Sequence, residues 1–557
     1  MLALCRLLLL CSTATAWAAD SGPAPVASFA GQLAAQAHRE HALDVEPGDY
    51  VQGRLRGDGM RLVLLDAQGA RVRVLSKGRR EVEEFMFVTG SSGPYRLDVR
   101  APKAGDYRLE ILQRVPRAAQ VRPAELPESP RLRSLLQSGD TAAFWREIEA
   151  GGTPLVESEG VTPPLAAHER LVTFLWRGAE RTVRLHGGPS ADHDELRRLA
   201  GTDIWYRSYR LPDSTRLAYR LAPDVPELDL PPHLRRRAIL ATAQRDPLNP
   251  RSIPDKPLDR YDGYSLFELP AAPVAEWNAP RPGVPVGTLE SLRLESRILG
   301  NTRDIHLYRP AGWRPGAAGN AIVVLFDGEI YTREVPTPSI LDNLIAAGRL
   351  PSTAAVFIAN PSNETRGREL PPNPDFARFL AEELMPWAKA RGLSAPAART
   401  VIAGASYGGL AAAWAGFTHP ELFGNVYSQS GSFWWAPGWE NSDMYTRPAE
   451  WLTQRFAESP RRPLRLHLEA GLFEMGRDGQ PGIRDTTRHL RDVLQAKGYA
   501  VSHREYAAAH GHEHWRASFA EGLVTLIGAE KVGAGGTAQG QALTPRPVGG
   551  TMRTILN

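Results

Sequence analysis

The chain has 557 residues and a formal net charge of +4, and 42% of its residues are hydrophobic. This length exceeds what one hydrophobic core supports, so we expect several domains. The lysines and arginines are spread along the chain. The sequence therefore lacks the dense basic runs that are typical of nucleic-acid-binding proteins. A mild basic excess is compatible with an anionic substrate without requiring one.

The N-terminus has the pattern of a secretory signal peptide. Arg6 supplies a positive charge, residues 7–11 begin a short apolar run, and residues 16–18 (Ala-Trp-Ala) form a cleavage site. We predict a signal peptide over residues 1–18 and a periplasmic location; a cytoplasmic location is the alternative if this leader is not a signal. Both cysteines lie in this segment, so we expect no disulfide and no cysteine nucleophile in the mature protein. No other stretch is apolar over the length that a membrane span needs.

Two segments with short, alternating apolar patterns follow. Residues 26–115 contain strand-like runs separated by turns with Gly and Pro, which predicts an accessory β-sandwich domain without a catalytic constellation. A Pro-rich linker covers residues 116–130. Residues 131–282 begin with a helical pattern at 142–148 and continue with alternating strands, which predicts a second β-sandwich-like domain.

The pattern changes at residue 287. From there to residue 530, buried-type strands such as 321–326 and 354–359 alternate with helices, which predicts a doubly wound α/β domain. Residues 533–557 are rich in Gly and lack an apolar period, which predicts a disordered tail. The expected fold class is α/β, with a C-terminal α/β-hydrolase domain preceded by two β-sandwich-like domains.

A nucleophile motif lies between a predicted strand and a predicted helix. Residues 404–408 read Gly-Ala-Ser-Tyr-Gly and match G-x-S-x-G, the nucleophile elbow. An apolar run precedes the motif and a helix of small residues follows it, which is the context that the motif requires. We predict that Ser406 is the nucleophile. The predicted oxyanion hole consists of the backbone N–H of Tyr407 and those of Gly328 and Glu329, which follow the first central strand.

The catalytic acid is expected downstream of the serine, since α/β-hydrolases order their triad as serine, acid and histidine. Glu474 comes shortly after the predicted strand at 464–470, at the edge where catalytic groups gather in open sheets. We therefore predict that Glu474 is the acid. Asp478 and Asp485 are the alternatives.

Three histidines crowd together near the end of the predicted α/β domain, in the sequence His-Gly-His-Glu-His at 510–514. His510 follows a predicted strand and a short Ala-rich turn, so we predict that it is the base, with His512 as the alternative. Such a cluster also resembles a metal site, but only one acid and no cysteine accompany it, so we expect neither a metal nor another cofactor.

Several motifs that are far apart in the chain point to one family. Residues 428–435 (Ser-Gln-Ser-Gly-Ser-Phe-Trp-Trp), residues 366–370 (R-x-x-E-L) and residues 505–516 (E-Y-x-x-x-H-x-x-x-x-W-R) match its hydrolase part. Residues 196–219 and 246–250 look like its N-terminal sandwich. Together they resemble the enterochelin (enterobactin) esterases, within the esterase D group of α/β-hydrolases. The terminal pattern places its histidine at the first of the three clustered histidines.

The resemblance implies a substrate and the residues that bind it. The substrate of the family is a cyclic tri-ester of dihydroxybenzoyl-serine, often as its ferric complex, and hydrolysis lets iron leave. The resemblance places Arg366, Trp434 and Trp435 in the substrate pocket, where an arginine fork and aromatic faces suit a trianionic ferric catecholate. A structural ion pair with Glu369 is the alternative for Arg366. The two tryptophans point to opposite sides of an extended segment, so a core position for one of them is the alternative there.

Other functions fit the same fold. One is an esterase for acylated sugars or hydroxycinnamate esters, and another is a binding or iron-handling protein with an idle triad. A third is an acyltransferase that resembles the mycolyl enzymes. Arg366 and the aromatic residues 433–435 favour a periplasmic siderophore esterase that acts on a ferric or iron-free catecholate siderophore. We expect no nucleic-acid partner, and the sequence assigns no oligomeric state.

Overall fold

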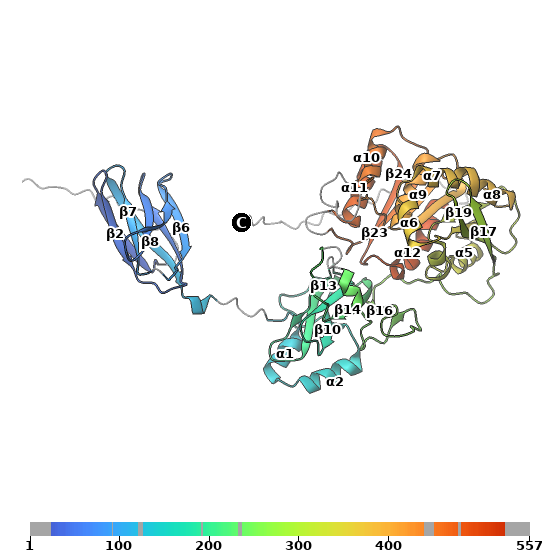
Figure 1. The fold of residues 1–557 in the computed structure, drawn as a ribbon. Coiled ribbons are helices and arrows are strands. Elements are labelled where there is room, and N and C mark those ends of the chain that lie inside the picture. The colour runs from blue at the N-terminus through green and yellow to red at the C-terminus, as the bar shows by residue number, and fades with distance from the viewer. Residues whose placement is uncertain are drawn as a thin grey trace, which may run out of the picture. The chain divides into compact units, whose positions relative to one another are not determined.

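The computed structural model describes most of the chain, namely residues 24–91, 93–120, 126–190, 193–231, 237–438, 450–476 and 481–529. The predicted signal peptide, the predicted C-terminal tail and Asp478 lie outside these residues. The chain divides into two compact units, Met1–Leu126 and Pro127–Asn557. In Figure 1 the first unit is blue and the second runs from cyan to red.

The first unit is a β-sandwich of two four-stranded antiparallel sheets. One sheet has the strand order β1-β8-β3-β6 and the other has the order β2-β7-β4-β5. Alternate residues point inward, so that Val51 and Leu55 of β3 share one core with Leu64 and Leu97 of the other sheet. The strands are β1 (Ala27–Leu33), β2 (His38–Leu43), β3 (Tyr50–Arg56), β4 (Arg61–Leu65), β5 (Arg71–Ser76), β6 (Val82–Val88), β7 (Tyr95–Arg100) and β8 (Gly105–Val115).

The second unit begins with two short helices and a β-sandwich-like part. Ser129 and Asp140 cap the helices, because each side chain accepts a hydrogen bond from an N–H of the first turn. The sheets β12-β13-β10-β9 and β11-β14-β16-β15 enclose a core with Phe174, Trp205 and Tyr219. The elements are α1 (Pro130–Ser138), α2 (Thr141–Gly151), β9 (Leu155–Glu157), β10 (Glu169–Arg177), β11 (Val183–Gly187), β12 (Arg197–Arg198), β13 (Ile204–Pro212), β14 (Arg216–Pro223), β15 (Ser252–Ile253) and β16 (Tyr264–Glu268).

A buried polar cluster ties the turn at residues 246–250 to this sandwich. The Tyr219 hydroxyl donates a hydrogen bond to the Asp246 carboxylate at 2.8 Å and accepts one from the Asn249 amide at 3.1 Å. Burial raises the pKa of both Tyr219 and Asp246. The side chains of this motif therefore hold the turn against strand β14.

The remainder of the second unit is an α/β domain on one eight-stranded sheet, with the order β17-β18-β20-β19-β21-β22-β23-β24. Strands β17 and β18 pair antiparallel, and the pairs from β20 to β24 are parallel. The expected fold class, an α/β domain that follows two sandwich-like parts along the chain, is confirmed. The strands are β17 (Thr288–Ser296), β18 (Asn301–Arg309), β19 (Ala321–Leu325), β20 (Thr353–Ile358), β21 (Thr400–Ala405), β22 (Asn425–Gln429), β23 (Arg465–Gly471) and β24 (Ala500–Tyr506).

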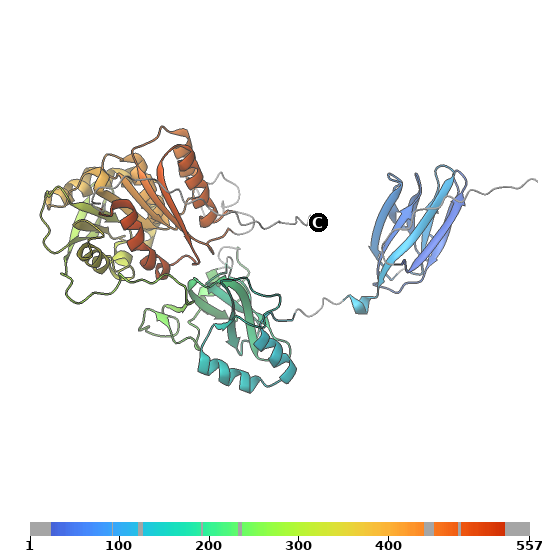
Figure 2. The same cartoon turned by 180° about the vertical axis from the view of Figure 1, so that it is seen from behind.

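Helices cover both faces of this sheet (Figures 1 and 2). Alternate residues of β19 enter two cores: Ile322 and Val324 face the core that contains α9, whereas Val323 and Leu325 face the one that contains α12. Burial on both faces explains the uninterrupted apolar runs of the central strands. The helices used below are α4 (Gly328–Arg333), α6 (Asn363–Glu369), α9 (Tyr407–Thr418), α10 (Trp451–Glu458), α11 (Ile483–Ala496) and α12 (His512–Ile527).

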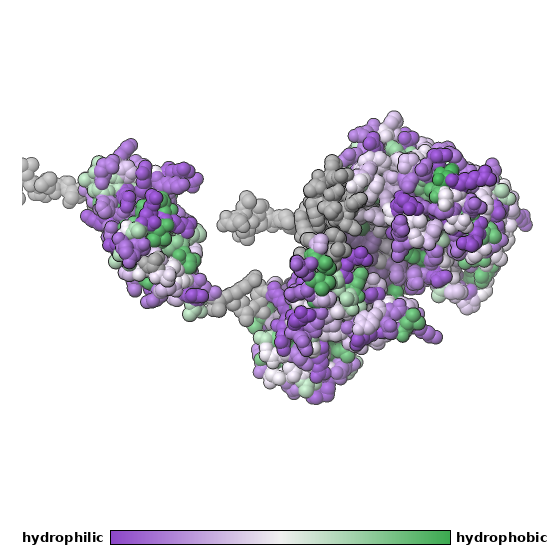
Figure 3. All heavy atoms as spheres, viewed as in Figure 1, coloured by the Kyte–Doolittle hydropathy of each residue, from purple (hydrophilic) through white to green (hydrophobic). Residues whose placement is uncertain are grey.

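The visible surface is mostly hydrophilic. On the face in Figure 3, purple residues predominate and green hydrophobic residues form small patches. In the part of the chain that the structure describes, no helix combines the length and the apolar character that crossing a bilayer requires.

Candidate active site

The turn around Ser406 has the strained geometry of a nucleophile elbow. Strand β21 ends at Ala405, α9 begins at Tyr407, and Ser406 between them has φ 58° and ψ −121°. Residues with a side chain rarely adopt this positive φ, so the surroundings must hold it. A Cβ on Gly404 would lie 2.7 Å from backbone atoms of Gly408. The absence of a side chain at Gly404 therefore lets strand and helix pass closely enough to form the turn.

The Ser406 side chain is half-buried beside the segment that follows β22. Its Oγ lies 3.4 Å from Oγ of Ser432, and its backbone N–H donates to the carbonyl of Gln429 at 3.0 Å. Among the described residues, Ser406 and His510 form no direct hydrogen bond. In enzymes without substrate such bonds are often long, and they tighten when the substrate binds.

Glu474 and His510 come together after strands β23 and β24. The Nδ1 atom of His510 lies 2.5 Å from Oε1 of Glu474, and Oε2 accepts the backbone N–H of Gly471 at 2.7 Å. The carboxylate is buried, whereas 41% of the His510 side chain is exposed. Because Glu474 engages Nδ1, Nε2 is the ring nitrogen that remains for proton transfer. The indole of Trp515 packs edge-on to this imidazole, with ring centroids 5.2 Å apart.

Two of the alternative residues, the base His512 and the acid Asp485, are described by the structure and have other partners. His512 begins α12, and its Nε2 lies 3.7 Å from a carboxylate oxygen of Glu334. Burial lowers the pKa of His512. Asp485 lies in the first turn of α11 and pairs with Arg484 at 3.0 Å. Within the described segments, neither residue joins the Glu474–His510 pair.

Two helix N-termini meet at the carboxyl edge of the sheet. Strands β19 and β21 are neighbours, and shortly after them α4 and α9 begin at Gly328 and Tyr407. A Cβ on Gly408 would lie 3.2 Å from a carboxylate oxygen of Asp327, which shows that the two turns touch. In the described structure, the backbone N–H groups of Gly328, Glu329 and Tyr407 form no hydrogen bond. The donors expected for the oxyanion hole are therefore unpaired groups of helix first turns.

Arg366 lies beside this edge and pairs with Asp327, a partner that the sequence did not indicate. Its Nε and Nη2 donate to the two carboxylate oxygens at 2.7 and 2.8 Å, and Asn360 donates to the same carboxylate at 2.6 Å. The guanidinium carbon lies 5.9 Å from the ring centroid of Tyr407. Glu369, the alternative partner, instead binds the buried Arg303 at 2.7 Å.

The two adjacent tryptophans separate. The centroid of the Trp434 ring lies 5.9 Å from that of Tyr407, the residue that follows Ser406. Trp435 packs edge-on to Trp451 of α10 at 6.1 Å and lies against the core of the α/β domain. Both rings are half-buried. Trp434 thus lies on the side of the segment that faces the site, and Trp435 lies on the side that faces the core.

Glu513 is a buried carboxyl that sequence reasoning missed. It lies in the first turn of α12, and only 4% of it is exposed. Burial raises its pKa to about 7, although its own backbone N–H, His510 and Arg216 act in the opposite direction. A Cβ on Gly511 would lie 2.0 Å from a carboxylate oxygen of Glu513, so a side chain there would displace this carboxyl from its present position. The available signal was a glutamate enclosed by clustered histidines where a helix begins.

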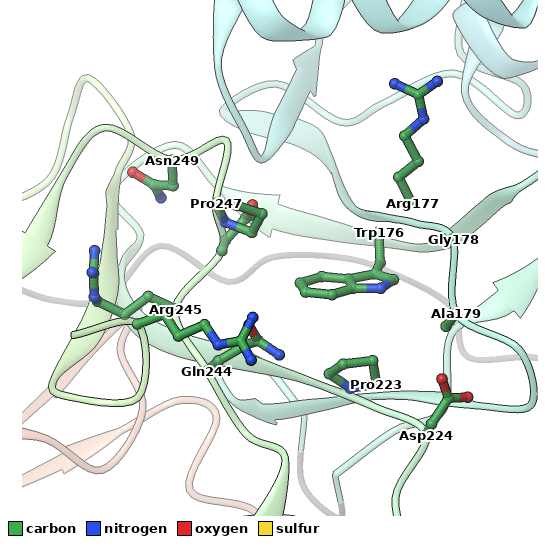
Figure 4. Close-up of a pocket in the computed structure, with 12 residues that line it drawn as sticks. Trp176, Arg177, Gly178, Ala179, Pro223, Asp224, Gln244, Arg245, Pro247 and Asn249 are labelled. Atoms are coloured by element: carbon green, nitrogen blue, oxygen red, sulfur yellow. The ribbon is translucent and has the colours of Figure 1, made fainter.

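The sandwich-like part of the second unit contains a hollow of about 610 Å³. Figure 4 shows the Trp176 ring at its centre, between Arg177 and Pro223, with Arg245 at the opposite side. No member of the predicted triad lines this hollow, so it is separate from the site around Ser406. Among the described residues, no group of three or more His, Cys, Asp or Glu side chains has an arrangement that would hold a metal ion.

Ester hydrolysis on this fold needs a serine on a sharp strand-to-helix turn, followed along the chain by an acid and a histidine. By fold and by site, this chain is a carboxylic-ester hydrolase of the α/β-hydrolase class. The family model described as "Putative esterase" matches residues 296–526, and "Enterochelin esterase, N-terminal" matches residues 171–278. The iron(III) enterobactin esterase of Dickeya dadantii is 33% identical over 423 residues, which are 70% of this chain and 94% of that protein. The chain belongs to the enterobactin esterase family.

Solved structures agree with this assignment. The enterobactin esterase of Shigella flexneri, determined in the presence of enterobactin, is 28% identical, with a TM-score of 0.53. The match covers 70% of this chain and 98% of that one. The ferric enterobactin esterase of Salmonella typhimurium is also 28% identical, with a TM-score of 0.55 and coverage of 69% and 98%.

Replacing Glu513 by Gln is expected to remove a pH dependence of stability. A carboxyl whose pKa rises from 4.5 to about 7 on folding holds its proton more tightly in the folded state. Its contribution to stability is therefore full below about pH 4.5 and is lost as the pH rises through 7. Relative to Glu513→Gln, the wild-type free energy of unfolding should fall by about 3 kcal/mol from acidic to alkaline pH. Urea denaturation of both proteins measures this difference, and a pH-independent difference would contradict it.

Proposed function

We propose that this chain is a serine esterase that hydrolyses the ester backbone of an enterobactin-like catecholate siderophore, bound as its ferric complex, and so releases iron. The observation that carries the proposal is the Glu474–His510 pair at 2.5 Å, at the same sheet edge as the strained Ser406. The relatives named above, which are enterobactin esterases, support this substrate class. Ser406 is the nucleophile, His510 the base and Glu474 the acid.

The reaction proceeds through an acyl-enzyme. His510 Nε2 takes the hydroxyl proton of Ser406 while Oγ attacks the ester carbonyl carbon, and the carbonyl electron pair moves to oxygen. When the carbonyl re-forms, the ester C–O bond breaks and His510 returns the proton to the leaving alkoxide. A water molecule then attacks the acyl-enzyme with the same base, which frees the carboxylic acid and regenerates Ser406.

Glu474 acts on the imidazole from the protein side. Its hydrogen bond to Nδ1 holds the ring so that Nε2 faces the reacting proton, and its charge stabilises the imidazolium that forms. Only 7% of Glu474 is exposed, and the N–H of Gly471 anchors its second oxygen. The interaction therefore acts in surroundings of low polarity, where it is stronger than in water.

Arg366 serves both the oxyanion and the substrate. Asp327 immediately precedes Gly328, whose N–H is an oxyanion donor, and an unpaired carboxylate there would repel the developing negative charge. The two-fold hydrogen bonding from Arg366 neutralises that carboxylate. Among the described residues Nη1 of Arg366 has no hydrogen-bond partner, so it remains as a donor for an anionic substrate.

Replacing Ser406 by Ala should abolish cleavage of ferric and iron-free enterobactin, with a loss in kcat of at least about 10⁴-fold. His510→Ala should lose activity to a similar extent, because it removes the base. His512→Ala is the matched control and should keep most of the activity, since His512 contacts Glu334 and not Glu474. Mass spectrometry of the linear trimer, dimer and monomer products measures each rate. Wild-type protein that cleaves a simple aryl ester but neither form of enterobactin would refute the proposed substrate.

Trp434 and Trp435 should respond differently to substitution. Trp434→Ala removes a ring beside Tyr407, so we expect weaker binding of the ferric siderophore by about 0.5–1.5 kcal/mol, or roughly 2- to 12-fold. Trp435→Ala removes packing against Trp451 and should chiefly lower the free energy of unfolding, by about 2 kcal/mol. Binding titrations with Ser406→Ala as the background and urea denaturation separate the two effects. Equal losses of affinity in both variants would contradict this division.

We also propose that the mature protein acts in the periplasm. The support is the sequence pattern of residues 1–18, with its apolar run and Ala-Trp-Ala cleavage site. Expression of the full chain in a Gram-negative host should yield a periplasmic protein whose N-terminus is Ala19 or Asp20, as measured by fractionation and intact mass. Leu8→Arg, which breaks the apolar run, should leave the uncut chain in the cytoplasm. Uncut wild-type chain in the cytoplasmic fraction would contradict the proposal.

A further inference from the structure

The residues that precede the acid and the base both pack into the sandwich of the second unit. Phe473 stands directly before Glu474, and Ala509 stands directly before His510. Both lie against the hydrophobic core formed by Phe174, Trp205, Tyr219 and their neighbours in that sandwich. The loops of the α/β domain that precede Glu474 and His510 therefore each place one residue against the core of the sandwich.

Backbone hydrogen bonds reinforce this packing. The N–H of Arg216, the first residue of β14, donates to the carbonyl of Ala507 at 3.0 Å, and Arg216 and Ala508 form a parallel bridge. The carbonyl of Ala508 in turn accepts the N–H of Phe473 at 3.1 Å. Strand β14, the histidine loop (residues 507–510) and the acid loop (residues 472–474) are thus connected by a continuous series of backbone hydrogen bonds.

Arg216 itself is fixed within the sandwich. Its side chain is buried, pairs with Glu268 and donates to the carbonyl of Pro273 at 2.5 Å. The buried carboxyl of Glu513 lies in the first turn of α12, an element that contacts β14. The strand that contacts the loop before His510 is consequently held by buried contacts within the sandwich and packs against α12.

The nucleophile has a different support. Ser406 is held by β21, α9 and the carbonyl of Gln429, all within the α/β domain. Both halves of the triad are therefore held by the sheet of the α/β domain, but only the loops at 472–474 and 507–510 are also seated in the sandwich. The position of the acid and the base relative to Ser406 thus depends in part on the sandwich. A misplacement of about 1 Å in such a constellation can lower a rate by about 100-fold.

We propose that the sandwich is a positioning element of the catalytic machinery, which seats Phe473 and Ala509 so that the Glu474–His510 pair meets Ser406. This inference rests on the proposed serine-esterase mechanism and goes beyond a role in substrate binding. Phe473 is a positioning residue, since it acts through Glu474 and does not itself touch the reacting atoms. A sandwich that only bound the siderophore would affect KM for that substrate and leave the hydrolysis of small esters intact.

The test uses the full chain and 4-nitrophenyl acetate, an ester too small to need the siderophore pocket. Phe473→Ala should lower kcat at least tenfold with little change in KM, and Phe473→Leu, which keeps a branched apolar side chain, should recover most of the loss. Leu307→Ala is the matched control, because Leu307 of β18 is buried but belongs to the core of the α/β domain and to neither loop. It should keep kcat near the wild-type value.

A spectroscopic readout separates positioning from general loosening. The proton between His510 Nδ1 and Glu474 should give a strongly deshielded NMR resonance in the wild type and in Leu307→Ala. It should shift or disappear in Phe473→Ala, and in a graded way in Phe473→Leu, which keeps the test valid if the alanine variant does not fold. Wild-type kcat and an unchanged resonance in the Phe473 variants would overturn the proposal, as would an equal loss in Leu307→Ala. Failure of the wild type to hydrolyse any ester would instead overturn the proposed function.

Discussion

The close passage of β21 and α9 is the constraint from which the site is built. Because Gly404 has no side chain, α9 can approach β21 closely enough to close the turn in which Ser406 has a positive φ. The same closeness brings the first turn of α9 against Asp327 and hence against α4. One tight contact thus places Ser406 and the unpaired N–H groups of Gly328, Glu329 and Tyr407 at a single edge of the sheet.

A buried polar network beneath this edge supports the strained turn. Gln429, whose carbonyl accepts the N–H of Ser406, donates through its amide to Glu469 at 3.1 Å and to Ser518 at 2.9 Å. Burial would raise the pKa of Glu469, but hydrogen bonds from His467 and Ser518 hold it below its ordinary value. A charged carboxylate with all these partners connects β22, β23 and α12. Removing one partner from such a buried network leaves the others unsatisfied, so the network favours a single arrangement.

Much of the architecture and part of the site could be predicted, because local patterns encode them. The change from alternating to continuous apolar runs identified the α/β sheet. Its strand ends led to the prediction of Ser406, Glu474 and His510 as the triad, and the structure brings the last two together. The partner of Arg366 could not be found in this way, since Asp327 is distant in sequence and only the fold brings them together. For the same reason the packing of Phe473 into the sandwich leaves no pattern in the sequence: an aromatic residue in a loop looks the same whether it faces solvent or another core.

The packing of Phe473 and Ala509 into the sandwich also restricts how the domains of this chain can be exchanged between genes during evolution. The sandwich and the α/β domain share one core, so neither is expected to be exchanged alone. A sandwich from another protein would need a core surface that fits both Phe473 and Ala509. Substitutions of the sandwich residues that contact Phe473 and Ala509 are therefore expected to be compensated by substitutions in the two loops. By this criterion the sandwich and the α/β domain make up one unit of recombination, although they look like two domains along the sequence.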